Sequence, residues 1–178
     1  GDFGFFYKNS LRESFKFLCR ESLRLVIKTK GSRHTVIHEE HFHVHILGSS
    51  KSNLAVYAFC NDEYQTRVAY KCLTEFLQKF EERVGEGWKN YKKDENINIG
   101  ELKDLIKKYE DPAEIDNVIK GLKTAEEIKI TLYGTIKKLF EREQDLDFLI
   151  NKSKDLSDQS KLLFRGTKQL QKPCCCVF

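Results

Sequence analysis

The chain has 178 residues, of which 33% are charged, and its 31 basic and 27 acidic side chains leave a formal net charge of +4. A charge this balanced argues against a nucleic-acid-binding protein, and no window approaches the roughly 18 consecutive apolar residues of a membrane-spanning helix. The length accommodates one domain of about 100 residues plus an extended element.

The first predicted element is an amphipathic helix over residues 10–29. Ser10 and Glu13 have the spacing of a capping box at its start, and Gly31 follows its end. Apolar residues recur between these limits at helical spacing. We therefore expect one face of this helix to pack on a sheet.

Three short strands are predicted next, at Arg33–His38, Phe42–Leu47 and Leu54–Cys60. The connections between them are short, which favours an antiparallel meander. The third strand is almost wholly apolar, as expected for a strand buried on both faces.

The histidines of the second strand, His43 and His45, alternate onto one face together with His41 just before it. They could bind a metal, but a polar face toward solvent is the favoured interpretation, so no metal site is predicted. Three cysteines lie among apolar residues, and we expect them to be small, reduced core residues: Cys19, Cys60 and Cys72.

Further helices are predicted at Tyr64–Val84 and Ile99–Tyr109, with a charged, glycine-containing linker between them. Asp111 and Pro112 then combine a good N-cap with the residue favoured at the first helical position. A long helix is predicted from there to about Leu170.

The long helix carries sixteen positions in strict 3-4 alternation, the seam of a coiled coil. They are Val118, Gly121, Ala125, Ile128, Leu132, Thr135, Leu139, Arg142, Leu146, Leu149, Ser153, Leu156, Ser160, Leu163, Thr167 and Leu170. A seam of this length spans about 80 Å at 1.5 Å per residue. Because that exceeds a domain of about 100 residues, the helix must either break and wrap around its own domain or find partner helices.

Arg142 is the one charged residue of the seam. Its guanidinium has five donors and would be satisfied among three polar acceptors, whereas alone and buried it would be strongly destabilising. A single polar seam residue commonly fixes register and oligomeric state. The alternative is an exposed arginine at the edge of the seam.

The stretch Leu139–Leu146, with seven seam positions before Arg142 and eight after it, resembles the R-SNARE motif of synaptobrevin-like proteins. The resemblance implies that Arg142 forms an ionic layer with three glutamines from three Q-SNARE helices in a parallel four-helix bundle. Zippering of that bundle would drive fusion of a vesicle with its target membrane. The seam residues implied are Val118, Ala125, Ile128, Leu132, Leu139, Leu146, Leu149, Leu156, Leu163 and Leu170.

The preceding part of the chain resembles a longin domain in three short stretches, which are Phe3-Gly4-Phe5-Phe6, Asn61-Asp62-Glu63-Tyr64 and Tyr109-Glu110-Asp111-Pro112. The implied fold is an α+β longin (profilin-like) domain followed by a long α-helical SNARE coiled-coil motif. The implied organisation is 1–84 longin domain, 85–110 linker with a short helix, 111–172 R-SNARE motif and 173–178 lipidation tail.

The longin fold begins with two strands before its first helix, and no such strands precede residue 10 here. The sequence also has no methionine, so we expect a longin domain that is incomplete at its N-terminus. The first longin strand would lie beside Leu54–Cys60. Without it, that apolar strand is predicted to be an exposed edge.

The last four residues satisfy the C-a-a-X pattern, which predicts a prenyl group on Cys175. Cys174 is the second candidate lipid site, for palmitate or a second prenyl group, because one lipid chain holds a protein only reversibly. Basic residues precede the tail and favour anionic lipid: Lys161, Arg165, Lys168 and Lys172. A chance cysteine cluster or a metal-binding tail is the alternative, and no other cofactor is predicted.

Lipid-anchored relatives of this kind fold the SNARE helix back on the longin domain, and Phe17 matches an aromatic position that supports this closed form. Ordinary helix core is the other interpretation of Phe17.

The resemblance implies a non-enzymatic protein that cycles between the cytosol and the cytosolic face of Golgi, endosomal and vesicle membranes, with roles in autophagy. The rival function is a membrane-tethered longin adaptor or a non-fusogenic SNARE decoy. No phosphate-binding loop or nucleophile–base pair indicates an enzyme.

Overall fold

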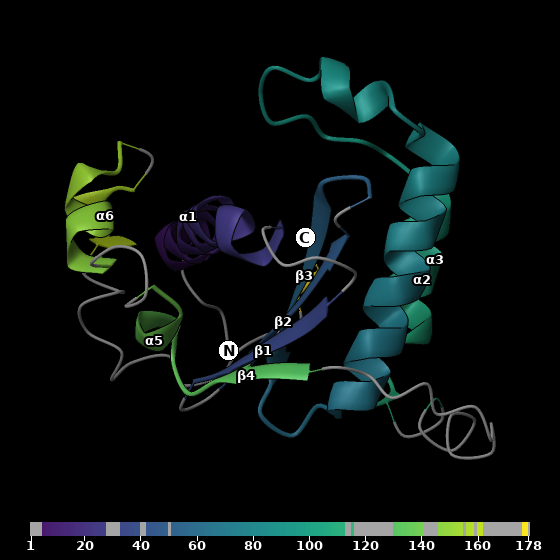
Figure 1. The fold of residues 1–178 in the computed structure, drawn as a ribbon, viewed down its shortest axis with the longest axis horizontal. Coiled ribbons are helices and arrows are strands. Elements are labelled where there is room, and N and C mark those ends of the chain that lie inside the picture. The colour runs from purple at the N-terminus through teal and green to yellow at the C-terminus, as the bar shows by residue number, and fades with distance from the viewer. Residues whose placement is uncertain are drawn as a thin grey trace.

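The computed structural model describes a folded body that includes parts of the C-terminal third of the chain (Figure 1). The described residues are 5–27, 33–39, 42–49, 51–112, 115, 130–140, 146–154, 156–158, 160–161 and 176–177.

The centre of the fold is a mixed sheet with the strand order β4-β1-β2-β3-β5. Strands β1 (Arg33–His38), β2 (Phe42–Ser49) and β3 (Leu54–Asn61) form the predicted antiparallel meander, which is confirmed. At one edge, β4 (Ile130–Tyr133) pairs parallel with β1. At the other edge, β5 (Cys176–Val177) pairs antiparallel with β3.

Helices cover both faces of this sheet (Figure 1). The long helix α1 (Phe5–Ile27) lies on one face and α2 (Thr66–Val84) lies on the other. The short helix α3 (Gly100–Lys108) packs against α2, and the 3-10 helix η1 (Gly87–Asn90) lies between them in the chain. The predicted helices at 64–84 and 99–109 are therefore present, within two residues of the expected limits.

Alternation along the strands produces two separate cores. On the α1 side, Leu18 packs with Ile46 and Phe59, and on the α2 side Leu73 packs with Leu47 and Cys60. Gly48 permits a close approach at the end of β2, because a Cβ there would lie 2.6 Å from a side-chain carbon of Val26 in α1. The sheet is thus buried on both faces, as the apolar third strand predicted.

The capping box predicted at the start of the first helix is wrong. Helix α1 begins five residues earlier, at Phe5, so Ser10 lies inside it and is buried. The carbonyl oxygen of Ser10 accepts a hydrogen bond from the hydroxyl of Ser14 (2.8 Å). Glu13 is consequently free of capping and bonds elsewhere, as described below.

The prediction of a solvent-facing histidine surface is also wrong. His34 and His45 are only 1% and 0% exposed, and they lie side by side on the face of the sheet that α2 covers. A ring nitrogen of His34 lies 3.2 Å from one of His45, and His38 and His43 form a second such pair at 2.9 Å. Burial lowers the pKa of His34 to about 4 and that of His45 to about 3, so the neutral imidazoles pack as core residues.

The β3 strand was expected to have an exposed edge, and this prediction is corrected by β5. Ala58 pairs with Val177 and Phe59 pairs with Cys176 along that edge. The C-terminal residues therefore occupy the side of β3 that the longin resemblance assigns to a first strand. Pairing of this kind satisfies main-chain groups that an open edge would leave unpaired.

The sequence allowed either one long helix that binds partner helices or a helix that breaks and wraps around its own domain. The C-terminal segment takes the second form. Over the described residues it forms β4 and then two short helices, α5 (Ile136–Phe140) and α6 (Leu146–Lys152), in place of one continuous helix. Gly134 ends β4 before α5 begins. An isolated amphipathic helix is marginal without packing partners, so the segment takes the local structure that buries each part on the domain.

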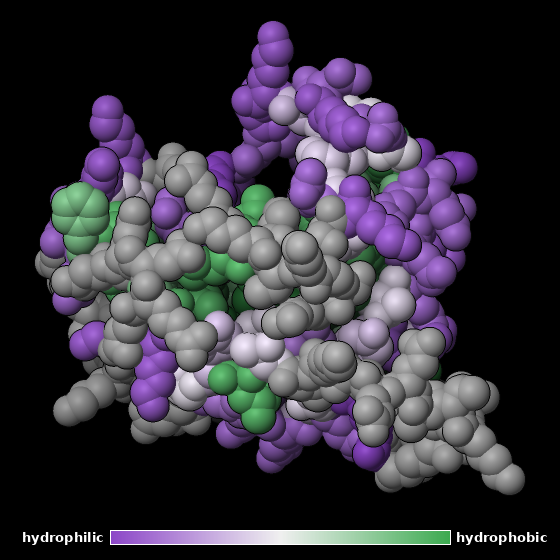
Figure 2. Space-filling view, viewed as in Figure 1, coloured by the Kyte–Doolittle hydropathy of each residue, from purple (hydrophilic) through white to green (hydrophobic). Residues whose placement is uncertain are grey.

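The surface of the molecule is uneven in polarity. The exterior of α2 and α3 is mostly hydrophilic, whereas an apolar side chain reaches the surface at α6 (Figure 2). That side chain is Phe148, which is 56% exposed. None of the described helices has the length and apolar character needed to cross a bilayer.

Candidate helix-docking site between α1 and the C-terminal segment

Helices α5 and α6 of the C-terminal segment lie next to α1 (Figure 1). Helix α5 joins the core between α1 and the sheet. Its residues Ile136, Leu139 and Phe140 are buried in the same cluster as Leu18 and Phe59. This part of the segment is thus packed as an integral layer of the domain.

Helix α6 packs on α1 through a separate apolar cluster centred on Phe17. The Phe17 ring is 3% exposed and packs with Ile150 and Leu156, which are also buried. Leu146 and Leu149 lie partly buried beside them. Burial of side chains of this size is worth about 1.5–3 kcal/mol each relative to exposure, so this cluster is a major part of the contact.

The carboxylate of Glu13 on α1 binds two serines that follow α6, Ser157 and Ser160. One oxygen of Glu13 accepts hydrogen bonds from the main-chain N–H of Ser157 (3.1 Å), the Ser157 hydroxyl (2.8 Å) and the Ser160 hydroxyl (2.7 Å). The Ser160 hydroxyl also lies 3.3 Å from the carbonyl oxygen of Ser10. Hydrogen bonds from Ser160 and Ser157 lower the pKa of Glu13, because they stabilise its charged form.

A second carboxylate holds the start of α5. Glu39, just after β1, accepts a hydrogen bond from the main-chain N–H of Ile136 (2.6 Å). The Thr135 hydroxyl accepts one from the N–H of Lys138 (3.2 Å). These bonds satisfy two of the N–H groups that a helix start leaves without a partner. Burial raises the pKa of Glu39, with the bond from Ile136 opposing the shift.

The predicted seam residues have unequal environments in this fold. Leu139 and Leu156 are buried, Leu146 and Leu149 are partly buried, and Leu132, on β4, is 65% exposed. The described part of the seam is therefore covered by the folded domain along α5 and α6 and left open at β4.

Sequence reasoning missed the residues that lie one position past the seam. Among those that contact the domain are four on α5, on α6 or just after α6, which we call the off-seam stripe: Ile136, Phe140, Ile150 and Ser157. The first three are 8%, 3% and 1% exposed. The apolar character of three of them was visible in the sequence, but the 3-4 pattern assigned importance only to their neighbours.

Several predicted residues lie outside the described part of the chain. They are Arg142, Val118, Ala125, Ile128, Leu163, Leu170, Cys174 and Cys175. Within the described ranges, no group of three or more His, Cys, Asp or Glu side chains is placed to hold a metal ion. The chemistry offered by the described site is therefore apolar burial plus two carboxylate contacts, as suits the docking of one peptide segment on another.

Comparison with known proteins identifies the family of the chain. A family model described as "Longin: Regulated-SNARE-like domain" matches residues 2–105. VAMP-like protein YKT61 of Arabidopsis thaliana is 30% identical over 175 residues, which cover 98% of this chain and 85% of that protein. Synaptobrevin homolog YKT6 of Candida glabrata is 27% identical over 177 residues, which cover 98% and 83%.

The family match bears out the α+β longin class, and the full-length similarity extends the relationship through the seam. The chain therefore belongs to the longin-domain family of synaptobrevin-like R-SNAREs, which are non-enzymatic proteins of vesicle trafficking.

Proposed function

We propose that this chain zippers with three Q-SNARE helices into a parallel four-helix bundle and thereby drives fusion of vesicles with target membranes. The sixteen-position seam supplies the packing surface of the bundle, and Arg142 supplies its ionic layer. The transport steps proposed are those of the Golgi, endosomal and autophagic routes.

The observation that carries the proposal is the burial of seam leucines against the chain's own domain. Leu139 is buried in the core between α1 and the sheet, Leu156 is buried against Phe17 of α1, and Leu146 and Leu149 are partly covered. A seam that needs an apolar partner is thus supplied with one by its own domain. Because the same side chains cannot face α1 and three partner helices at once, contact with α1 competes with assembly.

Regulation follows from this competition. In the closed form the longin domain withholds the seam, and partner helices must displace α1 to obtain it. A closed state favoured by a few kcal/mol lowers the apparent affinity for partners by the fraction of open chains. The exposed Leu132 is available to a partner helix before the rest of the seam is released.

Membrane attachment is assigned to the C-terminal cysteines. We expect Cys175 to carry a prenyl group and Cys174 to carry palmitate or a second prenyl group. Two lipids are needed because a single chain gives only reversible binding. The chain would then exchange between the cytosol and the cytosolic face of vesicle, Golgi and endosomal membranes.

Size-exclusion chromatography of the unlipidated chain, alone and with three Q-SNARE helices, tests the assembly. The proposal predicts a stable complex with one copy of each chain, and it predicts that Leu146→Asp prevents its formation. Circular dichroism should show a gain of helix on mixing. A monodisperse chain that forms no complex with any set of Q-SNARE helices would instead favour a tethered adaptor or decoy.

A further inference from the structure

We propose that the off-seam stripe is a second recognition surface on the SNARE segment, read by the chain's own longin domain and not by the bundle. The stripe consists of Ile136, Phe140, Ile150 and Ser157. Each follows a seam position by one residue, namely Thr135, Leu139, Leu149 and Leu156. This inference deepens the proposed function, because its statement about the four-helix bundle assumes that the chain forms that bundle.

Helical geometry separates the two surfaces. In an α-helix of 3.6 residues per turn, consecutive side chains differ in direction by about 100°. When the seam faces the axis of a bundle, a residue one position later is therefore turned away from that axis to the flank or the outside. The stripe residues cannot all serve as bundle core while the seam does so.

The closed fold buries the apolar members of the stripe more completely than the seam leucines of α6. Ile136, Phe140 and Ile150 are 8%, 3% and 1% exposed, whereas Leu146 and Leu149 are only partly buried. Phe140 is packed among the α1 core residues, and Ile150 packs with Phe17. Ser157 adds two hydrogen bonds to Glu13.

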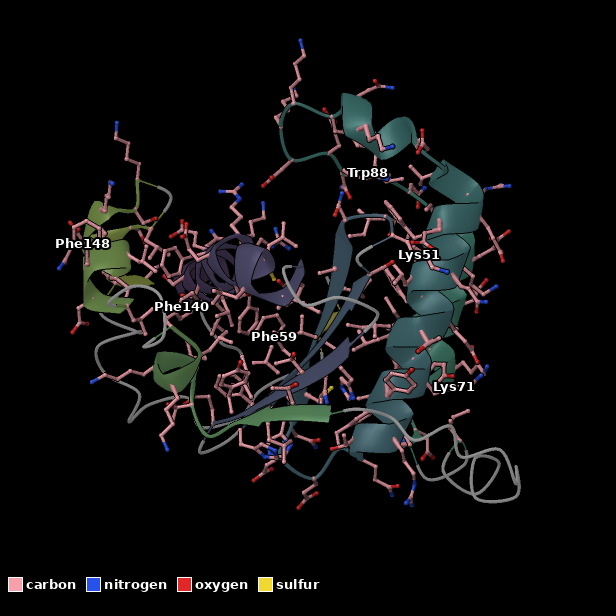
Figure 3. All side chains as sticks on the ribbon, in the orientation of Figure 1. Lys51, Phe59, Lys71, Trp88, Phe140 and Phe148 are labelled. Atoms are coloured by element: carbon pink, nitrogen blue, oxygen red, sulfur yellow. The ribbon has the colours of Figure 1, made fainter. Side chains whose placement is uncertain are left out.

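Phe148 provides a matched comparison on the same segment. It is an aromatic residue on α6, but it is 56% exposed and lies on the outer side of that helix, whereas Phe140 lies toward α1 (Figure 3). Its ring has the Lys152 ammonium 5.4 Å from its centroid, at the surface. Removal of the ring at 148 therefore removes a similar volume without removing a contact to α1.

The consequence is that closure and assembly can be altered independently. Phe140→Ala and Ile150→Ala should each raise the open-to-closed ratio by roughly 30-fold or more, taking the lower end of the cost of truncating buried apolar side chains. Neither should change the melting temperature of an assembled four-helix complex. Leu132→Ala should lower the melting temperature of the complex and leave the open-to-closed ratio unchanged, because Leu132 lies on the seam and is exposed in the closed form.

The test combines two measurements on the full chain. Native-state hydrogen exchange of α5 and α6 amides reports opening, and thermal melting of the complex with three Q-SNARE helices reports bundle stability. We expect faster exchange and unchanged melting for Phe140→Ala and Ile150→Ala, slower assembly and lower melting for Leu132→Ala, and no change for Phe148→Ala. The inference is overturned if the two stripe variants lower the melting temperature as much as Leu132→Ala, or if their exchange equals that of the parent chain.

Exchange of the β1–β3 amides controls for unfolding of the domain. If Phe140→Ala also speeds exchange of the sheet amides, the result for Ile150→Ala is the one that tests the inference, because Ile150 packs outside the main core cluster. A parent chain that forms no complex with any Q-SNARE helices would refute the proposed function alone. The exchange comparison of Phe140→Ala with Phe148→Ala would still show whether the stripe holds the segment on α1.

Discussion

Glu13→Gln is expected to open the contact between α1 and the C-terminal segment. In the closed fold one oxygen of Glu13 accepts three hydrogen bonds, from the N–H and hydroxyl of Ser157 and from the hydroxyl of Ser160. Glutamine preserves the size of the side chain and one acceptor oxygen, but it removes the charge. Loss of the charge weakens all three bonds at once.

The magnitude follows from the number and setting of these bonds. A hydrogen bond to a charged group contributes about 1.5–3 kcal/mol when buried, but Glu13 lies near the surface, where water competes for its oxygens. We therefore expect a total loss of about 1–2 kcal/mol, which is a 5- to 30-fold rise in the open population.

The same contacts make closure pH-dependent. Because the folded pKa of Glu13 is lowered, their stabilisation is present above the ordinary pKa and is lost as the pH falls through the lowered one.

Hydrogen exchange of the Ser157 and Lys161 amides measures this population directly, since the first binds Glu13 and the second binds the Ser157 carbonyl oxygen (3.0 Å). Glu21→Gln, the same charge change elsewhere on α1, is the control. The reasoning is refuted if Glu13→Gln leaves both exchange rates at the parent value, or if Glu21→Gln raises them equally.

Three further changes have defined outcomes. Acidification from pH 7 to 5 should lower the free energy of unfolding by roughly 2 kcal/mol for each of His34 and His45. Their folded pKa values of about 4 and 3 lie below the ordinary 6.5, so the unfolded chain binds protons that the folded chain does not; urea titrations with equal midpoints at both pH values would contradict this. Tyr57→Phe removes a hydroxyl that donates to the Cys19 carbonyl oxygen (3.1 Å), and it should cost about 1–3 kcal/mol in a urea titration. Cys175→Ser should abolish prenylation by a eukaryotic lysate, measured by mass spectrometry, and incorporation that persists in this variant would place the prenyl group elsewhere.

The strands and α2 could be predicted from sequence because their determinants are local. Thr35, Val36 and Ile37 favour extended backbone, and the apolar run of β3 matches a strand covered on both faces. The start of α1 could not be predicted in this way. Ser10 and Glu13 fit a capping box locally, but the partner of Glu13 is Ser157, 144 residues away.

The histidine face and the broken seam depend on tertiary context for similar reasons. Alternating histidines in β2 are compatible with a solvent-exposed face of the sheet as well as with a buried one. They are buried because α2 packs over that face, which the local sequence does not reveal. The seam pattern describes a helix in a bundle, and it holds no information on how the same residues behave against α1. The closed contact buries Leu139 and Leu156 of the pattern together with Phe140 and Ile150, which lie one position outside it.

In the proposed function, α1 and the partner helices compete for one seam. Pulsed electron paramagnetic resonance between labels at Arg12 on α1 and Lys154 after α6, carried on non-natural amino acids so that the native cysteines remain, measures this most directly. We expect one short distance between the labels in the free chain, and we expect this distance to disappear when three Q-SNARE helices form a stable complex. A stable complex that retains the short distance would contradict the claim, because the seam would then be bound by partners while α1 still covered it.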